Sequence, residues 1–354
     1  ELNQSPQCTT IHKGSEISEP FFFAPKHSIF GLPASDLSAS RALSVPELVK
    51  PATLERVNRA VEQLGYVRNG SARALASRRT MTIAAIYPSL DNPIFAVSIQ
   101  SLQQTLWDLG YQLLVASHDY RPEREVGLLR SFVERGVDAV VLVGTDHDDA
   151  VFELLSQYRI PYVLTWSMDT ANQRPCVGFS YYDSAFKMAQ AVIEYGHTEI
   201  ALCPGQSYRN ERVRARILGT QAALESAELK LRPEWIIEQP FTFEGGRSAV
   251  RQVLGGAQRP TVLICGNDLI AIGAIAQCRE QNIDVPNELS VTGSDDIEIA
   301  NMVEPPLTTV HVPKVEIGSL AAHRIVSLIE GSTSVEVSPL STRVVIRDSL
   351  RRIN

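Results

Sequence analysis

Short apolar runs alternate with amphipathic stretches over most of the chain, from residue 81 onward. The runs are continuous and rich in β-branched residues, which is typical of strands buried on both faces. They are Ile83–Tyr87, Tyr111–Ser117, Ala139–Gly144, Tyr162–Trp166, Ile200–Pro204, Val262–Cys265 and Leu289–Thr292. Between them, apolar residues recur at three- and four-residue steps, a spacing that predicts helices. The predicted helices include Ala96–Leu109, Glu123–Arg135, Ser184–Tyr195, Val213–Ala227, Gly246–Leu254 and Leu269–Gln281.

This alternation predicts an α/β fold of parallel sheets with helices on both faces. The pattern is too long for one sheet, so we expect two doubly wound parallel-sheet lobes. Ligands of open α/β sheets bind beyond the carboxyl ends of the strands, and two lobes would form a cleft there. We assign 81–178 and 297–330 to the first lobe, and 179–296 and 331–350 to the second.

The first 80 residues follow a different pattern. Apolar residues recur at helical spacing between Pro51 and Gly65, and these two residues suit the first turn and the end of a helix. A shorter helix is predicted over Asp36–Leu43. Residues 1–34 mix prolines, turn formers and a run of three phenylalanines, which predicts an atypical, disordered tail. We therefore expect a small helical head over 35–66 and a linker over 67–80.

Charge is divided unevenly along the 354 residues. The chain carries a net charge of −7, yet residues 41–80 hold eight basic and three acidic side chains, a balance of +5. Residues 1–40 contribute −2, so residues 81–354 carry −10. A basic segment joined to an acidic body suits phosphate contact by one end, although a solvated basic helix without a partner fits equally well.

Other sequence features exclude several classes of protein. The five cysteines have no metal-ligand spacing, and Cys203 and Cys265 lie in apolar runs, so we expect free core thiols in a reducing compartment. No apolar run is long enough to span a bilayer and no secretion signal is recognisable, which favours a cytoplasmic protein without a membrane partner. The stretch Asp146–Asp149 precedes a predicted helix and favours a capped polar loop over a metal site. We expect no metal and no cofactor.

A series of short motifs points to one family. In the head they are Ser38-Ala39-Ser40-Arg41-Ala42-Leu43, Glu47-Leu48-Val49, Ala52–Val57, Leu64-Gly65-Tyr66 and Asn69-Gly70-Ser71-Ala72-Arg73-Ala74-Leu75. In the body they are Asp91–Phe95, Gly196-His197, Gly266-Asn267-Asp268, Gly293–Asp296 and Pro305–Val310. Each motif is weak by itself, but in this order the chain resembles the lactose-repressor (LacI/GalR) family of transcriptional regulators over roughly 35–350.

The resemblance implies a DNA-binding repressor with a helix-turn-helix head, a hinge helix and a core like that of periplasmic binding proteins. It implies a homodimer or tetramer on double-stranded operator DNA, controlled by a sugar or sugar-acid effector such as gluconate. Its DNA contacts would be Ser38, Ser40, Arg41, Asn69, Arg73 and Leu75. Serine and arginine suit phosphates and base edges, and Leu75 would wedge into the minor groove unless it packs on its own domain.

The chain departs from the family pattern in front of the recognition helix. A first bracing helix is expected there, but Pro25, Gly31 and Pro33 disfavour any helix of normal length. We therefore expect an incomplete head. This keeps open an alternative in which the protein binds its ligand but no DNA.

For the effector site, Asp268 is the leading candidate. It follows the strand Val262–Cys265, where a carboxylate can accept hydrogen bonds from two sugar hydroxyls, and the resemblance carries a ligand role onto it. The alternative is an N-cap of the next helix. The resemblance also implies effector contacts for Arg214 and its neighbour Arg212, and for Asn92, Phe95 and Phe241.

Arginines in this stretch suit a ligand that bears a carboxylate or a phosphate. Arg209 and Arg216 lie close by, and at least two of the four arginines are expected to face solvent. Phe95 and Phe241 could stack on a sugar ring or could simply belong to the core.

Two other functions remain to be weighed. An enzyme is not expected, because the chain has no phosphate-binding loop, dinucleotide fingerprint, HExxH motif or nucleophile elbow. A periplasmic-type sugar-binding protein would share the core, since fold alone does not fix function. It would, however, need a secretion signal and would have no use for the basic segment 41–80.

Overall fold

The computed structural model describes residues 41–43, 46–66, 79–168, 174–332 and 338–353. The chain divides into two units, 1–69 and 70–354, each described here by itself. The expected tail 1–34, and the expected linker as far as residue 78, lie outside the described residues.

The described part of the first unit is helical. Residues 41–43 are helical, and a 3₁₀ turn η1 (Pro46–Leu48) and a helix α2 (Pro51–Leu64) follow. Helix α2 confirms its prediction, because Pro51 lies in its first turn and Gly65 ends it with a left-handed φ of 57°. The Gly65 backbone N–H donates to the carbonyl oxygen of Glu62 at 3.2 Å.

The first lobe of the second unit contains a parallel sheet in the order β2-β1-β3-β4-β5. Its strands are β1 (Thr82–Tyr87), β2 (Gln112–Ser117), β3 (Ala139–Val143), β4 (Tyr162–Thr165) and β5 (Cys176–Val177). In register, Ile83 lies opposite Leu113 on one side and Ala139 on the other. Four of these strands confirm the apolar runs, whereas the two-residue β5 was not predicted.

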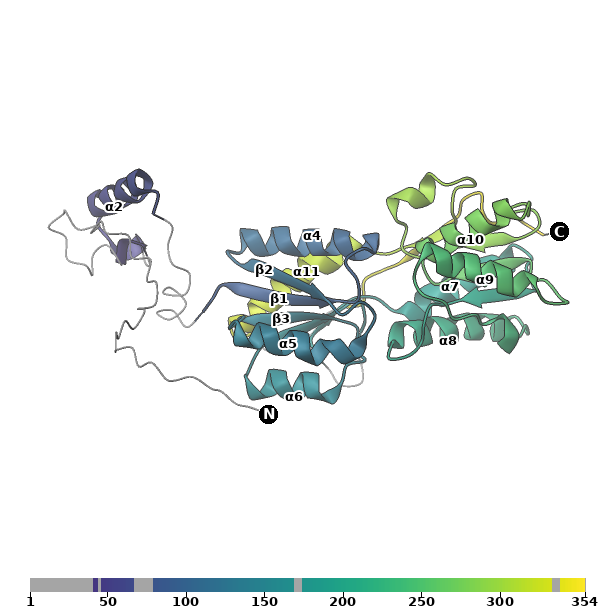
Figure 1. Cartoon of the computed structure of the whole chain (residues 1–354), viewed down its shortest axis with the longest axis horizontal. Coiled ribbons are helices and arrows are strands. Elements are labelled where there is room, and N and C mark those ends of the chain that lie inside the picture. Colours follow the sequence, from purple (N-terminus) through teal and green to yellow (C-terminus); the bar gives the residue numbers. More distant parts are fainter. Residues whose placement is uncertain (1–40, 44–45, 67–78, 169–173, 333–337, 354) are drawn as a thin grey trace, which may run out of the picture. The chain divides into compact units, whose positions relative to one another are not determined.

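Helices cover both faces of this sheet, as Figure 1 shows. They are α4 (Pro93–Asp108), α5 (Glu125–Glu134) after a 3₁₀ turn η2 (Pro122–Arg124), α6 (Asp149–Gln157) and α11 (Lys314–Ile329). Ile83, Ala85 and Tyr87 of β1 pack in one apolar cluster with α4 and α11. Ala84 and Ile86 pack in another cluster with α5 and α6. Both faces are buried, so the strand sequence is continuously apolar.

The second lobe repeats this layering around a three-stranded parallel sheet in the order β6-β7-β8. Its strands are β6 (Ile200–Cys203), β7 (Val262–Cys265) and β8 (Ser290–Thr292). Its helices are α7 (Tyr181–Glu194), α8 (Glu211–Ser226), α9 (Phe243–Leu254) and α10 (Asp268–Glu280), with a 3₁₀ turn η3 (Pro233–Trp235). Cys203 and Cys265 are buried in its core, as predicted.

The chain crosses between the lobes after β8, and the segments around β9 and β10 are here called the crossing segments. After the 3₁₀ turn η4 (Glu298–Asn301), strand β9 (Thr309–His311) leads into α11 of the first lobe, and β10 (Arg343–Val345) returns antiparallel to β9. The first lobe was expected to resume at residue 297. Instead Ile297, Ala300 and Leu307 pack in the core of the second lobe, because their side chains complete the apolar layer against α10. The crossing therefore comes later, at β9.

No helix in the described ranges is both long and apolar enough to cross a membrane.

Candidate functional site

A cleft lies between the two lobes, beyond the carboxyl ends of their strands. Its deepest part, here called the inner cavity, is lined by both lobes. The lining residues are Asn92, Ile94, Phe95 and Tyr120 from the first lobe, and Tyr181, Asn210, Arg212, Arg216, Phe241, Asn267 and Asp295 from the second. The rings of Tyr120 and Phe241 meet across the cleft, with centroids 5.5 Å apart. Four predicted effector residues, Asn92, Phe95, Arg212 and Phe241, thus lie together.

The first-lobe wall is built by the start of α4. The Asn92 side-chain oxygen accepts the Ile94 backbone N–H at 3.3 Å and caps the helix. Phe95, one turn into the helix, packs edge-on against Tyr87 and Trp166, with centroids 5.7 Å and 5.3 Å away. Phe95 belongs to the core cluster and also lines the cavity, so the two expected roles coexist.

Four arginines lie at the start of α8 or just before it, and they differ in what they contact. Arg209 and Arg214 are half-exposed and form ion pairs with Asp148 (3.0 Å) and Asp146 (2.5 Å) on the loop after β3. Arg212 and Arg216 line the inner cavity. We expected Arg214 to contact the effector, but it does not line the inner cavity.

The reason is helical geometry. The buried face of α8 carries Val213, Arg216 and Thr220, which follow one another at three- and four-residue steps. Arg214 lies two residues, about 200°, from Arg216 and therefore points to the opposite side.

Arg216 is a buried cation that lacks an anionic partner. It is 9% exposed, and its guanidinium lies 4.4 Å from the ring centroid of Tyr181 and 5.8 Å from that of Phe241. Within the described part of the chain, no carboxylate lies within 4.0 Å of it. Burial lowers the pKa of Arg216, although the Tyr181 ring and the Asp295 carboxylate oppose this shift. An uncompensated buried charge is costly unless a ligand supplies the counter-charge.

Asp268 does not line the inner cavity. It is fully buried, and its two carboxylate oxygens accept the Thr309 hydroxyl at 2.5 Å and the Ile297 backbone N–H at 2.9 Å. Burial raises the pKa of Asp268 to about 7. The capping role considered for Asp268 belongs to its neighbour, because the Asn267 side chain accepts the Ile270 N–H at 2.9 Å. Asp268 therefore joins the strand end to the crossing segments.

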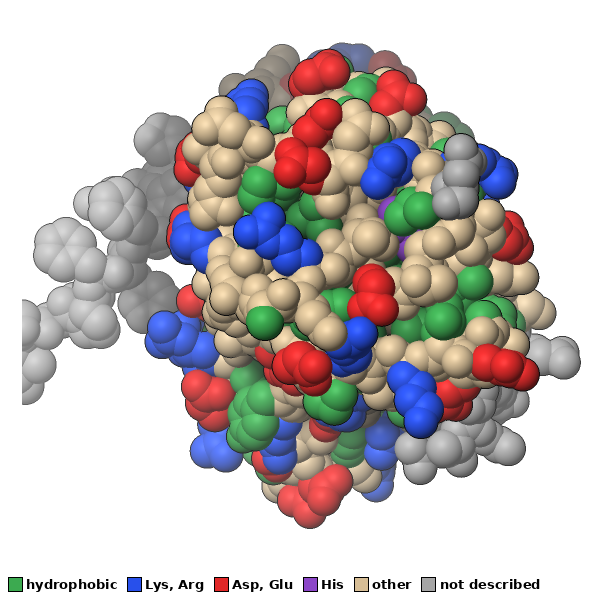
Figure 2. Space-filling view, turned by 90° about the vertical axis from the view of Figure 1, so that its right-hand side faces the viewer, with side chains coloured by type: hydrophobic (Ala, Val, Ile, Leu, Met, Phe, Trp, Pro, Cys, Tyr) green, Lys and Arg blue, Asp and Glu red, His purple; other side chains and the backbone are tan. Residues whose placement is uncertain are grey.

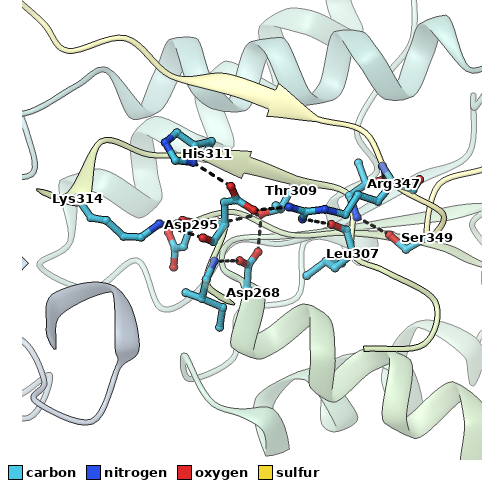
Figure 3. A network of polar contacts seen from close by, with 11 residues as sticks. Asp268, Asp295, Leu307, Thr309, His311, Lys314, Arg347 and Ser349 are labelled. Carbon is cyan, nitrogen blue, oxygen red and sulfur yellow. Dashed lines mark hydrogen bonds and ion pairs between the residues drawn. The ribbon is translucent and has the colours of Figure 1, made fainter. Parts of the chain in front are cut away.

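Figure 3 shows the network around Asp268 where the crossing segments meet. Burial opposes ionisation of Asp296, but hydrogen bonds from Arg347 (2.6 Å) and His311 (2.8 Å) outweigh it and hold the Asp296 pKa below its usual value. Lys314, at the start of α11, donates to the backbone carbonyl oxygens of Asp295 (3.2 Å) and Asp296 (2.9 Å). The network thus links the start of α10 to β9, to the start of α11 and to the segment that follows β10.

The lining residues that were not predicted as effector contacts include three with polar side chains: Asn210, Asn267 and Asp295. The Asn210 side-chain oxygen and the Asn267 side-chain nitrogen are buried without a hydrogen-bond partner in the described chain. Burial, and secondly the Asp268 carboxylate, raise the pKa of Asp295 well above its usual value. One signal could have found these residues, because each stands at the carboxyl end of a strand or at the start of the following helix.

Backbone strain gathers around the cleft. A positive φ is rare for residues other than glycine, and such residues cluster at functional sites. Six lie in the loops at or next to the cavities: Asp119, Tyr120, Trp166, Arg209, Asp295 and Asp296, with φ from 45° to 122°. The chain thus holds several cleft residues in conformations that residues other than glycine rarely adopt.

Two other groups of predicted residues remain. Of the DNA-contacting candidates, Ser38, Ser40, Asn69, Arg73 and Leu75 lie outside the described residues, and Arg41 is exposed. In the stretch Asp146–Asp149, Asp148 caps α6 by accepting the Ala150 N–H at 3.1 Å, which confirms a capped polar loop.

Comparison with known proteins identifies the family to which the chain belongs. Residues 189–350 match the model of a periplasmic binding protein-like domain. The chain is 32% identical to the HTH-type transcriptional repressor PurR of Erwinia tasmaniensis over 311 residues, which cover 86% of this chain and 91% of that protein.

Two solved structures carry the same architecture. One is a LacI-family transcriptional regulator from Silicibacter pomeroyi, with a TM-score of 0.77 and 28% identity over 90% of this chain and 96% of that one. The other is the complex of the transcriptional regulator CelR with cellobiose, with a TM-score of 0.70 and 28% identity over 88% of this chain and 94% of that one. The chain belongs to the LacI family of transcriptional regulators.

Proposed function

We propose that this protein is an operator-binding repressor whose DNA affinity is set by a sugar acid bound in the cleft. Family membership supports the regulatory role, and CelR, a similar regulator, binds cellobiose. One observation carries the choice of an acid: Arg216 is buried in the inner cavity without a carboxylate partner among the described residues. A ligand carboxylate can accept two parallel hydrogen bonds from a guanidinium, and this supplies the missing counter-charge.

The rest of the inner cavity suits the polyol part of such a ligand. Asn210 and Asn267 offer unpaired amide groups to hydroxyls, and Phe95 and Phe241 offer ring faces to carbon–hydrogen surfaces. Arg212 adds a second cation beside Arg216. Asp268 acts in this proposal from behind the cavity, where it holds the crossing segments in place.

In this proposal the effector controls repression by shifting the population between open and closed arrangements of the lobes. An effector that contacts both lobes favours the arrangement in which those lobes are closed, provided that it binds the open arrangement less tightly. The crossing segments carry this difference toward the N-terminal end. The basic segment 41–80 then contacts phosphates, in a homodimer on a two-fold operator.

The proposal that the effector is a sugar acid is tested with a pair of variants in α8. Arg216→Met keeps the length and the ring contacts but removes the charge, and Arg214→Met is the matched control on the solvent side. Gluconate should raise the melting temperature of the wild type while glucose does not. Loss of a buried charge-assisted contact should weaken gluconate binding at least about thirtyfold in Arg216→Met, against less than about threefold in Arg214→Met. Equal stabilisation by glucose and gluconate would contradict the proposal.

DNA binding is tested separately with the full chain. Selection from a pool of random duplexes should enrich a two-fold symmetric sequence, and gluconate should change the affinity for it. If no duplex is enriched while gluconate still binds, the protein is a ligand-binding member of the family without operator binding.

A further inference from the structure

The cleft continues outward from the inner cavity into a second and larger one. This outer cavity measures about 350 Å³, against about 30 Å³ for the inner one. The two share Tyr120, Asn210 and Arg212 in their linings, so one molecule can occupy both. Small-molecule sites are typically about 300–1,000 Å³, and the outer cavity falls in that range. A hexonate with its carboxylate on Arg216 is larger than the inner cavity, so it would extend into the outer one and leave the remainder of that space for a further group.

The outer cavity differs from the inner one in its charge. Its carboxylates and cations already have partners within the protein. Glu125 binds His147 at 2.8 Å, Arg209 binds Asp148 at 3.0 Å, Asp146 binds Arg214 at 2.5 Å and Glu238 binds the Ser207 hydroxyl at 2.6 Å. No free cation comparable to Arg216 lines it among the described residues. A second anionic group would meet four lining carboxylates, whereas hydroxyl groups could donate to their remaining lone pairs.

Two buried polar atoms in the outer cavity also lack partners. The Asn210 side chain is 6% exposed, and its oxygen accepts no hydrogen bond within the described chain. The same holds for Nδ1 of His118, on the opposite wall. Burial lowers the pKa of His118, which keeps the imidazole neutral. Unpaired groups of this kind are costly, and a hydroxyl can serve as donor to one and acceptor to another.

An aromatic ring stands at the rim of the outer cavity. Tyr208 lines it and is 78% exposed, the largest exposure among the large apolar and aromatic side chains of the described chain. It precedes Arg209, whose φ of 45° fixes the local direction of the loop. An exposed ring beside hydroxyl-binding groups suits the apolar face of a sugar ring.

We propose that the outer cavity binds an uncharged glycosyl unit attached to the acid in the inner cavity, so that the effector is a glycosylated sugar acid of disaccharide length. The acid end rests on the proposed function, through Arg216. The glycosyl end rests on the outer cavity alone, through its volume, its balanced charge, the unpaired atoms of Asn210 and His118, and the Tyr208 ring.

The test compares ligands of two lengths, each with and without the carboxylate. The probes are gluconate, maltobionate and cellobionate as acids, and glucose, maltose and cellobiose as neutral partners. Calorimetric titration of the full chain should give at least one disaccharide acid a dissociation constant at least tenfold lower than that of gluconate. A gluconate affinity equal to or higher than that of both disaccharide acids overturns the proposal, as does a panel in which nothing binds.

Variants assign the gain in affinity to the outer cavity. Tyr208→Ala should weaken the preferred disaccharide acid at least tenfold and gluconate less than twofold, and His118→Phe, which fills the cavity, should do the same. Tyr158→Ala removes another exposed tyrosine, 55% exposed and outside both cavities, and should change neither. Equal losses for both acids in Tyr208→Ala and His118→Phe would overturn the glycosyl site.

The two proposals fail in different ways. If a neutral disaccharide binds as tightly as its acid, the carboxylate on Arg216 is wrong while the outer cavity stands. If gluconate binds as tightly as the disaccharide acids, the outer cavity is wrong while the sugar acid stands.

Discussion

Asp268 and Asp295 are two buried carboxyl groups beside one another at the lobe crossing (Figure 3). Desolvation raises the pKa of both, and the Asp268 carboxylate raises the pKa of Asp295 further. Asp268 has two hydrogen-bond donors, from Thr309 and Ile297, which favour its ionised form. A proton held by one of the two carboxyls relieves most of the repulsion between them.

This pair should make stability fall as pH rises. The pKa of each carboxyl is higher in the folded chain than in the unfolded chain, so the folded state holds the proton more tightly. Its contribution is complete below about pH 4 and is lost as the pH rises through about 7. Asp268→Asn keeps both contacts, since the amide can accept from Ile297 and donate to Thr309, but it cannot ionise.

Denaturant unfolding from pH 4 to pH 8 measures the effect. The decline in the free energy of unfolding should be shallower in Asp268→Asn than in the wild type, by at most about 1.4 kcal/mol per pH unit. Asp183→Asn, which replaces an exposed carboxylate in the first turn of α7, serves as the control and should follow the wild type. Parallel curves for Asp268→Asn and wild type would show that Asp268 does not hold a proton in this range.

Single residues show where sequence reasoning reaches its limit. The types of side chain in the cleft could be predicted, since Asn92, Phe95, Arg212 and Phe241 do line the inner cavity. The direction in which a side chain points was harder to predict. Arg214 and Arg216 differ by half a turn of α8, and only the periodicity of the buried residues around them separates the two. Asp268 was misplaced because it follows a strand end, yet its partners Ile297 and Thr309 are about 30 and 40 residues away along the chain.

Among whole elements, the strands that coincide with apolar runs were predicted, including the three-residue β8, whereas β5, β9 and β10 were not. Strands such as β1 and β3 are buried on both faces, and their sequences are therefore unbroken apolar runs. Strands β5, β9 and β10 have two or three residues each, too few for any periodicity. Their pairing depends on where the crossing segments meet, and no local pattern contains that information.

Two elements on opposite sides of the cleft are joined by an interlobe strap, defined as the loop 145–148 after β3 and the residues 209–214 at the start of α8. Arg209 pairs with Asp148, Arg214 pairs with Asp146, and Glu211 accepts the Thr145 backbone N–H at 2.9 Å. The loop belongs to the first lobe and the helix to the second. The strap therefore favours a closed cleft even without a ligand.

The strap predicts a salt-dependent effect on effector binding. Half-exposed ion pairs contribute little and are screened by salt, so the double variant Arg209→Ala/Arg214→Ala should weaken effector binding only about two- to fivefold at low ionic strength. The difference from wild type should shrink near 0.5 M salt, where the Debye length falls to about 4 Å. Calorimetric titration at two salt concentrations provides the measurement.

A matched double variant controls for the loss of two surface arginines. Arg247→Ala/Arg251→Ala removes pairs with Glu280 and Glu244 that lie wholly within the second lobe. It should leave effector affinity unchanged at both salt concentrations. A loss in the strap variant that persists at high salt would mean that Arg209 or Arg214 contacts the ligand directly.

At the scale of the whole molecule, charge is distributed unevenly along the chain. Residues 81–354 carry −10, and on the face of the core seen in Figure 2 the acidic and basic side chains are interspersed rather than gathered into a basic patch. The basic balance of +5 belongs to residues 41–80. Because a body with this charge would be repelled by a duplex, we expect the phosphate contacts to come from the N-terminal segment.

This division predicts which arginines determine the salt dependence of DNA binding. Arg41 is exposed at the end of the expected recognition helix, so Arg41→Ala should weaken binding and make the slope of log affinity against log salt shallower by about 0.9 for one lost phosphate contact. Arg247→Ala removes one positive charge from the core and should leave the slope unchanged. Fluorescence anisotropy with the selected duplex between about 0.05 and 0.2 M salt gives both slopes. If the two variants flatten the slope equally, then net charge rather than the basic segment governs DNA binding. The expectation that the head, and not the core, contacts phosphates would then be wrong.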